Sequence, residues 1–326
     1  MTKIAFFNIR PGEKESLQDK MGEIEADFFE TPINSKNLPE KKDYEIISIL
    51  GLSKIDEDVL KALPNLKLIT TRSTGFDQID LEASEKSGVL VSNVPTYGEE
   101  TVAEYTIALL LALSRKIPQA INKVKQEKTF HSQGLTGFDL IGKTLGVIGT
   151  GHIGTHVIKI AKGFGMKIAA FDAYPNQNLA QDLGFEYTSL ENLLNNSDVI
   201  TLHVPLLPST NHLINLDNIN LIKKGTVIVN TSRGEVLQTE ALIKALEEGI
   251  LSGAALDVIE NEKALRVSKK QEFFPQLNKL LEMDNVLISP HNAYNTEEAK
   301  EKIQQTTIDN IKSFLNGNPI NLVKPK

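Results

Sequence analysis

The sequence of 326 residues contains neither cysteine nor tryptophan. The absence of cysteine excludes disulfide bonds, thiolate zinc sites, iron–sulfur clusters and cysteine nucleophiles. Long hydrophobic runs are lacking as well, because the longest purely apolar run, residues 107–113, is far too short to span a bilayer. The net charge of −7 disfavours attraction to a polyanion. We therefore expect no membrane and no nucleic-acid partner.

The first residues also lack a secretory signal, because Met1-Thr2-Lys3 leads straight into an apolar run with no small-residue cleavage site. Hydrophobic residues make up 40% and charged residues 24%, which is typical of globular proteins. The length corresponds to about two domains. The sequence therefore predicts a cytoplasmic globular protein of about two domains.

Short apolar runs alternate with amphipathic stretches along most of the chain. Most runs are continuous and rich in Val, Ile and Leu, which is typical of parallel strands covered on both faces. A long apolar stretch, residues 99–114, and a polar connection, residues 116–142, interrupt the series. The alternation predicts an α/β fold with two doubly wound parallel sheets, one on each side of the interruption. The expected strands are residues 4–9, 45–50, 67–71 and 89–94 in the first sheet, and residues 144–148, 167–171, 199–203, 226–230, 254–258 and 286–289 in the second.

A glycine-rich turn follows the first expected strand of the second sheet. Residues 149–154 read Gly-Thr-Gly-His-Ile-Gly, a G-x-G-x-x-G pattern, and an amphipathic stretch comes next. Between a strand and a helix, these glycines permit a tight turn, close approach of the backbone to a pyrophosphate, and close helix–strand packing. The helix amino end offers free N–H groups to the phosphates. The turn indicates a dinucleotide site, with a glycine-rich surface turn as the plainer alternative.

An acidic residue ends the next expected strand. Asp172 follows the last glycine of the motif, Gly154, at close to the spacing of about 20 residues that is typical of dinucleotide sites. A carboxylate at this position binds the ribose hydroxyls of the dinucleotide. A carboxylate here repels the 2′-phosphate of NADP, and no arginine follows in residues 173–176. These features predict NAD rather than NADP as the cofactor.

Three polar residues follow expected strands of the second sheet: Arg233, Glu262 and His291. Open α/β sheets bind ligands at the carboxyl ends of their strands, so these side chains are expected to converge beside a bound nicotinamide. Taken singly, each has a plainer interpretation as a surface arginine, a solvated glutamate or a structural histidine. No cluster of residues has metal-ligand spacing, and we predict no metal site.

The three side chains together suit hydride transfer at C2 of a 2-hydroxy acid. A neutral imidazole accepts the hydroxyl proton at about pH 7 and returns it in the reducing direction. A carboxylate beside the ring stabilises the imidazolium and fixes the tautomer. A guanidinium pairs with the substrate carboxylate and polarises the C2 oxygen.

Segments along nearly the whole chain resemble the D-isomer-specific 2-hydroxyacid dehydrogenases, and the D-lactate dehydrogenase branch in particular. The resemblance implies a Rossmann NAD-binding domain, a flavodoxin-like substrate domain, and Arg233, Glu262 and His291 as the catalytic residues. Glu262 is preferred to Glu260 because the family's acid lies five residues after the aspartate of its Asp-Val pair, here Asp257. The matching segments are 73–77 (Ser-Thr-Gly-Phe-Asp), 93–97 (Asn-Val-Pro-Thr-Tyr), 101–105 (Thr-Val-Ala-Glu-Tyr), 142–154, 203–205 (His-Val-Pro), 230–234 (Asn-Thr-Ser-Arg-Gly), 255–258 (Ala-Leu-Asp-Val) and 290–291 (Pro-His).

The resemblance also implies binding roles. The residues implied to bind substrate are Thr74, Gly75, Tyr97, Arg233 and Tyr294, with the backbone of Thr74 and Gly75 on the substrate carboxylate. The residues implied to contact the cofactor are Gly149, Gly151, His152, Ile153, Gly154, Asp172, Val204, Pro205, Thr210, Thr231, Ser232 and Asp257, the last through the nicotinamide carboxamide.

The domain boundaries follow from the resemblance, because no apolar run follows the last amphipathic stretch, residues 297–315, and the pattern alone assigns it to neither sheet. The family's last helix returns to the first domain. This implies a discontinuous substrate domain, residues 1–97 and 294–326, and an NAD-binding domain, residues 98–293, that close to exclude water. It also implies a homodimer through the NAD-binding domains, with residues 99–114 as the interface helix.

Substrate choice depends on few positions. Val94-Pro95-Thr96-Tyr97 resembles the D-lactate dehydrogenase branch, whereas Tyr294 stands where that branch usually has phenylalanine. We expect NADH-dependent reduction of pyruvate or a similar 2-oxo acid. Alternatives within the family are glyoxylate or hydroxypyruvate reductase and phosphoglycerate dehydrogenase, whereas formate dehydrogenase pairs its histidine with glutamine. An NAD(H)-sensing binding protein, like the corepressors that share this fold, is the alternative from another class.

Overall fold

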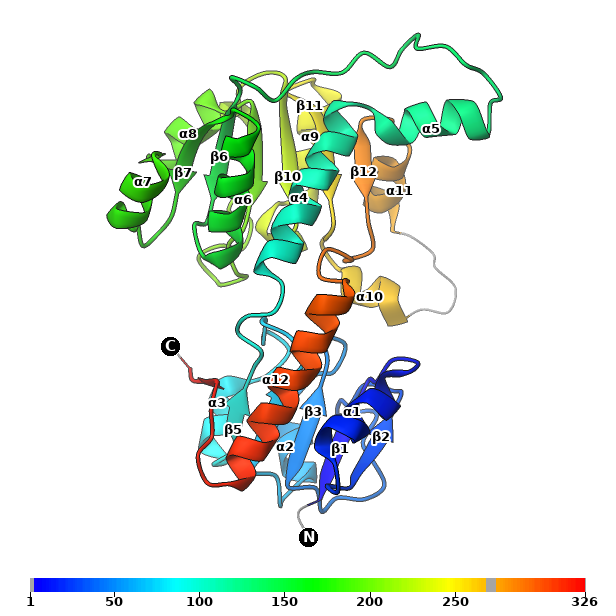
Figure 1. The fold of residues 1–326 in the computed structure, drawn as a ribbon, viewed down its shortest axis with the longest axis vertical. Coiled ribbons are helices and arrows are strands. Elements are labelled where there is room, and N and C mark those ends of the chain that lie inside the picture. The colour runs from blue at the N-terminus through cyan, green and yellow to red at the C-terminus, as the bar shows by residue number, and fades with distance from the viewer. Residues whose placement is uncertain (1–2, 268–273, 326) are drawn as a thin grey trace. The chain divides into compact units, whose positions relative to one another are not determined.

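The computed structural model describes residues 3–267 and 274–325 (Figure 1). The chain divides into two compact units, a terminal unit of Met1–Tyr97 with Thr296–Lys326, and a central unit of Gly98–Asn295. Each unit contains one sheet, six-stranded in the first and seven-stranded in the second. The α/β fold with two sheets predicted from the sequence is therefore confirmed. None of the helices in the described residues combines the length and the apolar character that crossing a bilayer requires.

The terminal unit has the strand order β13-β5-β4-β3-β1-β2, parallel except for β13 against β5. Side chains alternate between the faces of a strand, so Ile4 and Phe6 pack with α1 and α12, whereas Ala5 and Phe7 pack with α2. The strands are β1 (Ile4–Phe7), β2 (Ala26–Phe29), β3 (Ile46–Ile49), β4 (Leu68–Thr71), β5 (Leu90–Ser92) and β13 (Leu322–Val323), and the helices are α1 (Glu13–Met21), α2 (Glu57–Ala62), α3 (Leu81–Lys86) and α12 (Glu297–Leu315).

The central unit has the order β12-β11-β10-β9-β6-β7-β8, and its strands are all parallel. Helices α4 and α6 pack on one face of the sheet, and α8 and α9 on the other. The strands are β6 (Thr144–Ile148), β7 (Lys167–Phe171), β8 (Glu186–Tyr187), β9 (Val199–Leu202), β10 (Thr226–Asn230), β11 (Leu251–Leu256) and β12 (Val286–Ile288). The helices are α4 (Glu99–Ser114), α5 (Ile117–Lys125), α6 (His152–Gly163), α7 (Gln177–Leu183), α8 (Leu190–Asn196), α9 (Thr239–Glu247), α10 (Glu262–Val267) and α11 (Pro275–Leu281), with 3₁₀ turns η1 (Ile219–Leu221) and η2 (Gly234–Val236).

The strand order of the central sheet places its ligand-binding edge. The chain proceeds outward from β6 in both directions, through β7 on one side and β9 on the other. Open α/β sheets bind ligands at the carboxyl ends of the strands where the order reverses in this way. The turn after β6 and the loop after β9 are therefore neighbours at this edge.

The structure contains elements that the sequence pattern missed. β2, β8 and β13 were not expected, and β8 and β13 have two residues each, too few for a hydrophobic pattern. The expectation that no strand follows the last helix is wrong, because β13 follows α12 and pairs with β5. Residues 116–142, expected as a polar connection, contain α5.

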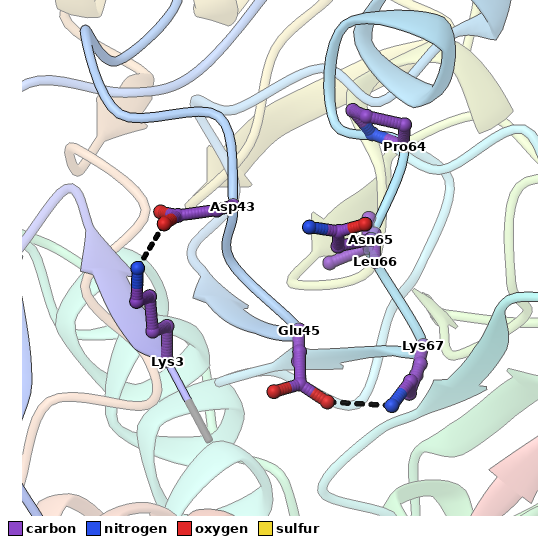
Figure 2. A pocket seen from close by; sticks show the side chains of 7 residues that line it. All are labelled: Lys3, Asp43, Glu45, Pro64, Asn65, Leu66 and Lys67. Atoms are coloured by element: carbon purple, nitrogen blue, oxygen red, sulfur yellow. Dashed lines mark hydrogen bonds and ion pairs between the residues drawn. The ribbon is translucent and has the colours of Figure 1, made fainter. Parts of the chain in front are cut away.

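A surface hollow of the terminal unit lies at the amino ends of β1, β3 and β4 (Figure 2). Its charged side chains pair with one another, Lys3 with Asp43, and Lys67 with Glu45 at 2.6 Å. The charges offset each other, and ligands of open α/β sheets bind at the opposite, carboxyl ends of the strands. This hollow is therefore not the candidate site.

Candidate active site

The glycine-rich turn joins β6 to α6. Gly149 has φ +95°, and its N–H donates to the Phe171 carbonyl at 2.8 Å. A Cβ at Gly149 would lie 2.8 Å from the His203 backbone, and a Cβ at Gly154 would lie 2.0 Å from the Gly149 carbonyl oxygen. The packing of the turn itself therefore requires glycine at both positions.

Gly151 differs because nothing in the described protein requires glycine there. A Cβ at Gly151 would meet no atom within 4 Å, and its φ of −64° is open to any residue. The residue precedes α6, whose first N–H groups, including those of His152 and Ile153, lack partners within the helix. The open space over this helix end fits a ligand that approaches the backbone closely, as a pyrophosphate does.

Asp172 follows β7, and hydrogen bonds hold its carboxylate beside the glycine-rich turn. The N–H and hydroxyl of Thr150 donate to Oδ2 at 2.7 and 2.9 Å, and the Tyr174 N–H donates to Oδ1 at 2.9 Å. The Tyr187 hydroxyl lies 2.7 Å from the Thr150 hydroxyl and donates to it, because Thr150 uses its own proton on Asp172. Sequence reasoning identified Asp172 but missed Thr150 and Tyr187.

The loop after β9 borders the same turn. A Cβ at Gly149 would lie 2.9 Å from the Val204 side chain. Within this loop the Thr210 hydroxyl donates to the Pro205 carbonyl at 2.5 Å and accepts from the Leu207 N–H at 2.8 Å. Thr210 therefore shapes the loop that carries Val204 and Pro205.

Arg233 lies in the turn after β10, and a buried asparagine folds this turn. Asn230, 1% exposed, donates through Nδ2 to the Arg233 carbonyl at 2.9 Å, and its Oδ1 accepts from the N–H and hydroxyl of Ser232 at 3.0 and 2.9 Å. The hydroxyls of Thr231 and Thr106, the latter on α4, lie 2.8 Å apart. The guanidinium of Arg233 donates to the Ser232 carbonyl at 2.8 Å. Hydrogen bonds thus hold both the backbone carbonyl and the guanidinium of this half-buried arginine.

Gly234 brings the loops after β10 and β11 into contact. A Cβ at Gly234 would lie 2.0 Å from the Ile259 carbonyl carbon and 2.4 Å from the Glu260 nitrogen. The two loops therefore touch backbone to backbone, which only glycine allows. Since β10, β11 and β12 are neighbours in the sheet, the loops that carry Arg233, Glu262 and His291 meet at one edge.

Two glutamates follow β11, and they have different partners. Oε1 of Glu262, the first residue of α10, lies 2.6 Å from Nδ1 of His291. Oε1 of Glu260 lies 2.7 Å from Nε2 of His212, and its Oε2 accepts from the Thr239 N–H at 2.6 Å. Burial alone would raise the pKa of Glu260, but the hydrogen bonds from Thr239 and His212 hold this pKa below its usual value. Glu262, and not Glu260, is thus paired with His291.

The backbone and ring of His291 are both constrained. Its φ of +50° is uncommon for a non-glycine residue, and its N–H donates to the Asp257 carbonyl at 2.8 Å. A carboxylate on Nδ1 favours the neutral tautomer that carries its proton there, which leaves Nε2 for proton exchange. The side chain is 27% exposed, so the ring is shielded on most sides yet open to a small molecule.

Asp257, which follows β11, holds the loop that carries His291. It is 1% exposed and accepts from the Ser289 hydroxyl at 2.5 Å and from the N–H groups of Asn292 and Ala293, each at 2.8 Å. Burial raises the pKa of this carboxyl, and the three hydrogen bonds oppose the shift. Sequence reasoning assigned Asp257 to the cofactor and missed this contact with the loop.

The candidate substrate residues of the terminal unit follow its central strands. Thr74 and Gly75 come shortly after β4, and among the described residues neither of their N–H groups donates a hydrogen bond, so both are available to a carboxylate. Tyr97 is half-buried and is the last residue of the first segment of this unit. Tyr294 belongs to the central unit, where its ring stands edge-on to the His291 ring with centroids 6.3 Å apart.

His203 is a second histidine near the glycine-rich turn. Burial lowers the pKa of its imidazole to about 3. Its Nε2 lies 2.9 Å from the Thr201 hydroxyl, and its Nδ1 is buried without a hydrogen-bond partner among the described residues. The ring stays neutral at physiological pH, so His203 is no acid–base candidate.

Comparison with known proteins gave matches over almost the whole chain. Residues 107–293 match the family model described as D-isomer specific 2-hydroxyacid dehydrogenase, NAD binding domain. The chain is 37% identical over 323 residues to D-lactate dehydrogenase of Escherichia coli, covering 97% of each. It is also 37% identical over 299 residues to glyoxylate reductase of Korarchaeum cryptofilum, covering 90% of this chain and 87% of the other. The crystal structure of Aquifex aeolicus D-lactate dehydrogenase complexed with NAD and lactic acid matches with a TM-score of 0.91 at 37% identity, covering 99% of each chain.

Proposed function

This chain belongs to the D-isomer-specific 2-hydroxyacid dehydrogenases, and from that premise we propose that it reduces pyruvate, or a 2-oxo acid of similar size, to the D-2-hydroxy acid with NADH. The observation that carries the proposal is the 2.6 Å contact between His291 and Glu262, at the sheet edge where the Arg233 turn also lies. A histidine with a carboxylate on one nitrogen and its other nitrogen open is suited to pass a proton to a substrate oxygen.

Each side chain has a proposed role in the reducing direction. His291 donates its Nε2 proton to the C2 oxygen of the 2-oxo acid, and Glu262 stabilises the imidazolium before that transfer. Arg233 pairs with the substrate carboxylate and polarises the C2 oxygen. The N–H groups of Thr74 and Gly75 bind the same carboxylate. NADH, when bound, supplies the hydride.

We propose the central unit as the NAD-binding domain and the terminal unit as the substrate domain, in a cytoplasmic enzyme. The open space at Gly151 supports the pyrophosphate position, and the fixed carboxylate of Asp172 supports the ribose position. The proposed cofactor contacts are Gly149, Gly151, His152, Ile153 and Gly154 for the pyrophosphate, Asp172 for the ribose, Val204, Pro205 and Thr210 for the adenosine, and Thr231, Ser232 and Asp257 for the nicotinamide.

Reduction of glyoxylate or hydroxypyruvate is the second candidate. The glyoxylate reductase relative has the same 37% identity as the D-lactate dehydrogenase, so identity does not choose between the substrates. The ring of Tyr294 stands beside the His291 ring, and the hydroxyl that Tyr294 carries in place of phenylalanine favours a substrate with a polar side chain such as hydroxypyruvate. Tyr97 favours pyruvate through the resemblance of its segment to the D-lactate dehydrogenase branch.

The test is turnover, followed by the absorbance of NADH with pyruvate, 2-oxoisocaproate, phenylpyruvate, hydroxypyruvate and glyoxylate in parallel. We expect the highest kcat/KM with pyruvate and a D-lactate product on chiral chromatography. His291→Ala should abolish turnover while keeping NADH affinity. Tight NADH binding with negligible turnover of every 2-oxo acid would instead indicate an NAD(H)-sensing protein.

We also propose a homodimer through the central unit. The helix predicted at the interface, α4, buries one face against the sheet and α6, and no residue of the following helix, α5, is buried. α5 and the segment after it extend past the sheet (Figure 1) and expose Ile117, Ile121, Val124 and Phe130, the last at 94%. A second copy would cover this apolar face. Sedimentation of the wild type and of Ile121→Glu tests it, and a monomeric wild type would contradict it.

A further inference from the structure

The buried face of α12 carries one amide side chain among mostly aliphatic ones. Asn310 is 1% exposed, and its neighbours on this face include Ile303, Ile308 and Ile311. A leucine of similar volume would fill the same space with no need for partners, whereas a buried amide must be hydrogen-bonded. The amide is therefore explained by what it binds.

Every hydrogen-bonding group of the Asn310 side chain is used. Nδ2 donates to the Asn93 carbonyl at 2.8 Å and to the Thr70 hydroxyl at 3.4 Å. Oδ1 accepts from Nδ2 of Asn321 at 2.8 Å, and the Asn321 carbonyl accepts from the Asn93 N–H at 3.1 Å. The backbone of Asn93 is thus held on both its N–H and its carbonyl by residues from the end of the chain.

From Asn93 the contacts continue to the loop after β4. Nδ2 of Asn93, itself 6% exposed, donates to the Thr74 carbonyl at 2.8 Å. The Val94 N–H donates to the Ser73 carbonyl at 3.1 Å, and the Thr74 hydroxyl donates to the Val94 carbonyl at 2.9 Å. These three bonds tie residues 73–74 to residues 93–94.

Peptide geometry shows what these bonds orient. A carbonyl and the next N–H share one rigid plane and point in opposite directions across a trans peptide, and the described chain contains no cis peptide. The bond to the Ser73 carbonyl therefore sets the direction of the Thr74 N–H, and the bond to the Thr74 carbonyl sets that of the Gly75 N–H. No described residue accepts a hydrogen bond from the N–H of Thr74 or of Gly75.

We propose that Asn310 is a positioning residue for the substrate, which acts through Asn93 to aim the N–H groups of Thr74 and Gly75 at the substrate carboxylate. This inference rests on the proposed function. Loss of Asn310 releases the Asn93 carbonyl and allows residues 73–75 to relax. Because α12 and this loop belong to the terminal unit, the effect falls on the 2-oxo acid and not on the dinucleotide.

The experiment compares Asn310→Leu with Thr307→Val in the full-length protein. Thr307 is a matched control, because it is 0% exposed on the same helix face and, among the described residues, its hydroxyl bonds only the Ile303 carbonyl of its own helix, at 2.8 Å. For Asn310→Leu we expect the KM for pyruvate and the Kd of oxamate, an unreactive isostere of pyruvate, to rise about fivefold, the loss of one hydrogen bond. The kcat should stay within about twofold, and the KM for NADH should be unchanged.

Three outcomes decide the matter. A purely structural role would lower Tm and the active fraction of Asn310→Leu but leave its KM for pyruvate equal to that of Thr307→Val, and this refutes the inference while the proposed function stands. Absence of turnover in the wild type refutes the proposed function and the inference together. If Asn310→Leu fails to fold, Asn93→Ser, which loses the bond to the Thr74 carbonyl, must show the same rise in KM or the inference is wrong.

Discussion

Replacing each of the two glutamates after β11 by glutamine separates a role in proton transfer from a role in folding. Glu262→Gln keeps the shape of the side chain but removes its negative charge from His291, 2.6 Å away. Glu260→Gln removes the charge from its contacts with His212 and the Thr239 N–H, at 2.7 and 2.6 Å. Both substitutions are nearly isosteric, so each effect measures the loss of one charge.

Loss of the charge at Glu262 affects the proposed proton transfer, whereas loss of the charge at Glu260 affects the stability of the folded protein. A charge-assisted hydrogen bond is about twice as strong as a neutral one, which makes the difference about 1–2 kcal/mol. For Glu262 this difference weakens the support of the imidazolium, so kcat for pyruvate reduction should fall about five- to thirtyfold. For Glu260 it weakens the folded state, so the free energy of unfolding should fall by about 1–2 kcal/mol with kcat within about twofold.

The effect of Glu260 also depends on pH with a defined sign. Its pKa in the folded protein is below the ordinary 4.5, so its contribution to stability is fully present above pH 4.5 and is lost as the pH falls through the folded pKa. Wild type and Glu260→Gln should therefore converge in stability on acidification. Urea unfolding at pH 7 and below pH 4.5 measures the free energy of unfolding. The oxidation of NADH by pyruvate at pH 7 measures kcat. Equal losses of kcat in the two variants, or an undiminished kcat in Glu262→Gln, would refute the assignment.

The remaining predictions concern the cofactor site and a buried histidine. Gly151→Ala should leave Tm unchanged, because the new Cβ meets no atom within 4 Å. The same substitution should weaken NADH binding, measured by calorimetry, at least about tenfold. The matched variant Gly154→Ala should lower Tm, since its Cβ falls 2.0 Å from a carbonyl oxygen. An undisturbed NADH Kd in Gly151→Ala would argue against the pyrophosphate position. Asp172→Ala should lower the ratio of kcat/KM for NADH over NADPH about tenfold or more, and a constant ratio would rule out the ribose role. His203 has its pKa lowered from 6.5 to about 3, so the unfolded state binds the extra proton and the wild type should lose up to about 2 kcal/mol of stability between pH 7 and pH 5. His203→Gln should lack this loss in urea unfolding, and parallel pH profiles would contradict it.

The sheets could be predicted from the sequence where strands are covered on both faces. β6 and β10 consist mostly of apolar residues without polar alternation, and almost every residue in them is buried. β8 and β13 could not be predicted, because two residues carry no periodicity and their pairing depends on neighbours far along the chain. The same reason hid the antiparallel edge that β13 adds to β5.

The candidate site, like the sheets, could be predicted from the sequence only in part. The glycine-rich turn and Asp172 could be predicted because strand, turn, helix and acid follow one another in the sequence. Glu262 and Glu260 could not be told apart by composition, and only the family pattern separated them before the structure did. The contact of Asn310 with Asn93 spans 217 positions, and nothing in the sequence connects a helical asparagine with a loop so far away.

The arrangement of the candidate site follows from buried polar side chains that close the turns bearing the proposed catalytic residues. Asn230 folds the Arg233 turn and Asp257 holds the His291 loop, and both are 1% exposed. A polar group excluded from water must keep its partners or destabilise the fold, so movement of either turn carries a cost in stability as well as in activity. Substitutions that alter substrate preference are therefore expected at side chains other than these two buried ones. The positions of Arg233 and His291 are thereby tied to the stability of the central unit, because the same bonds hold the turns that carry these residues.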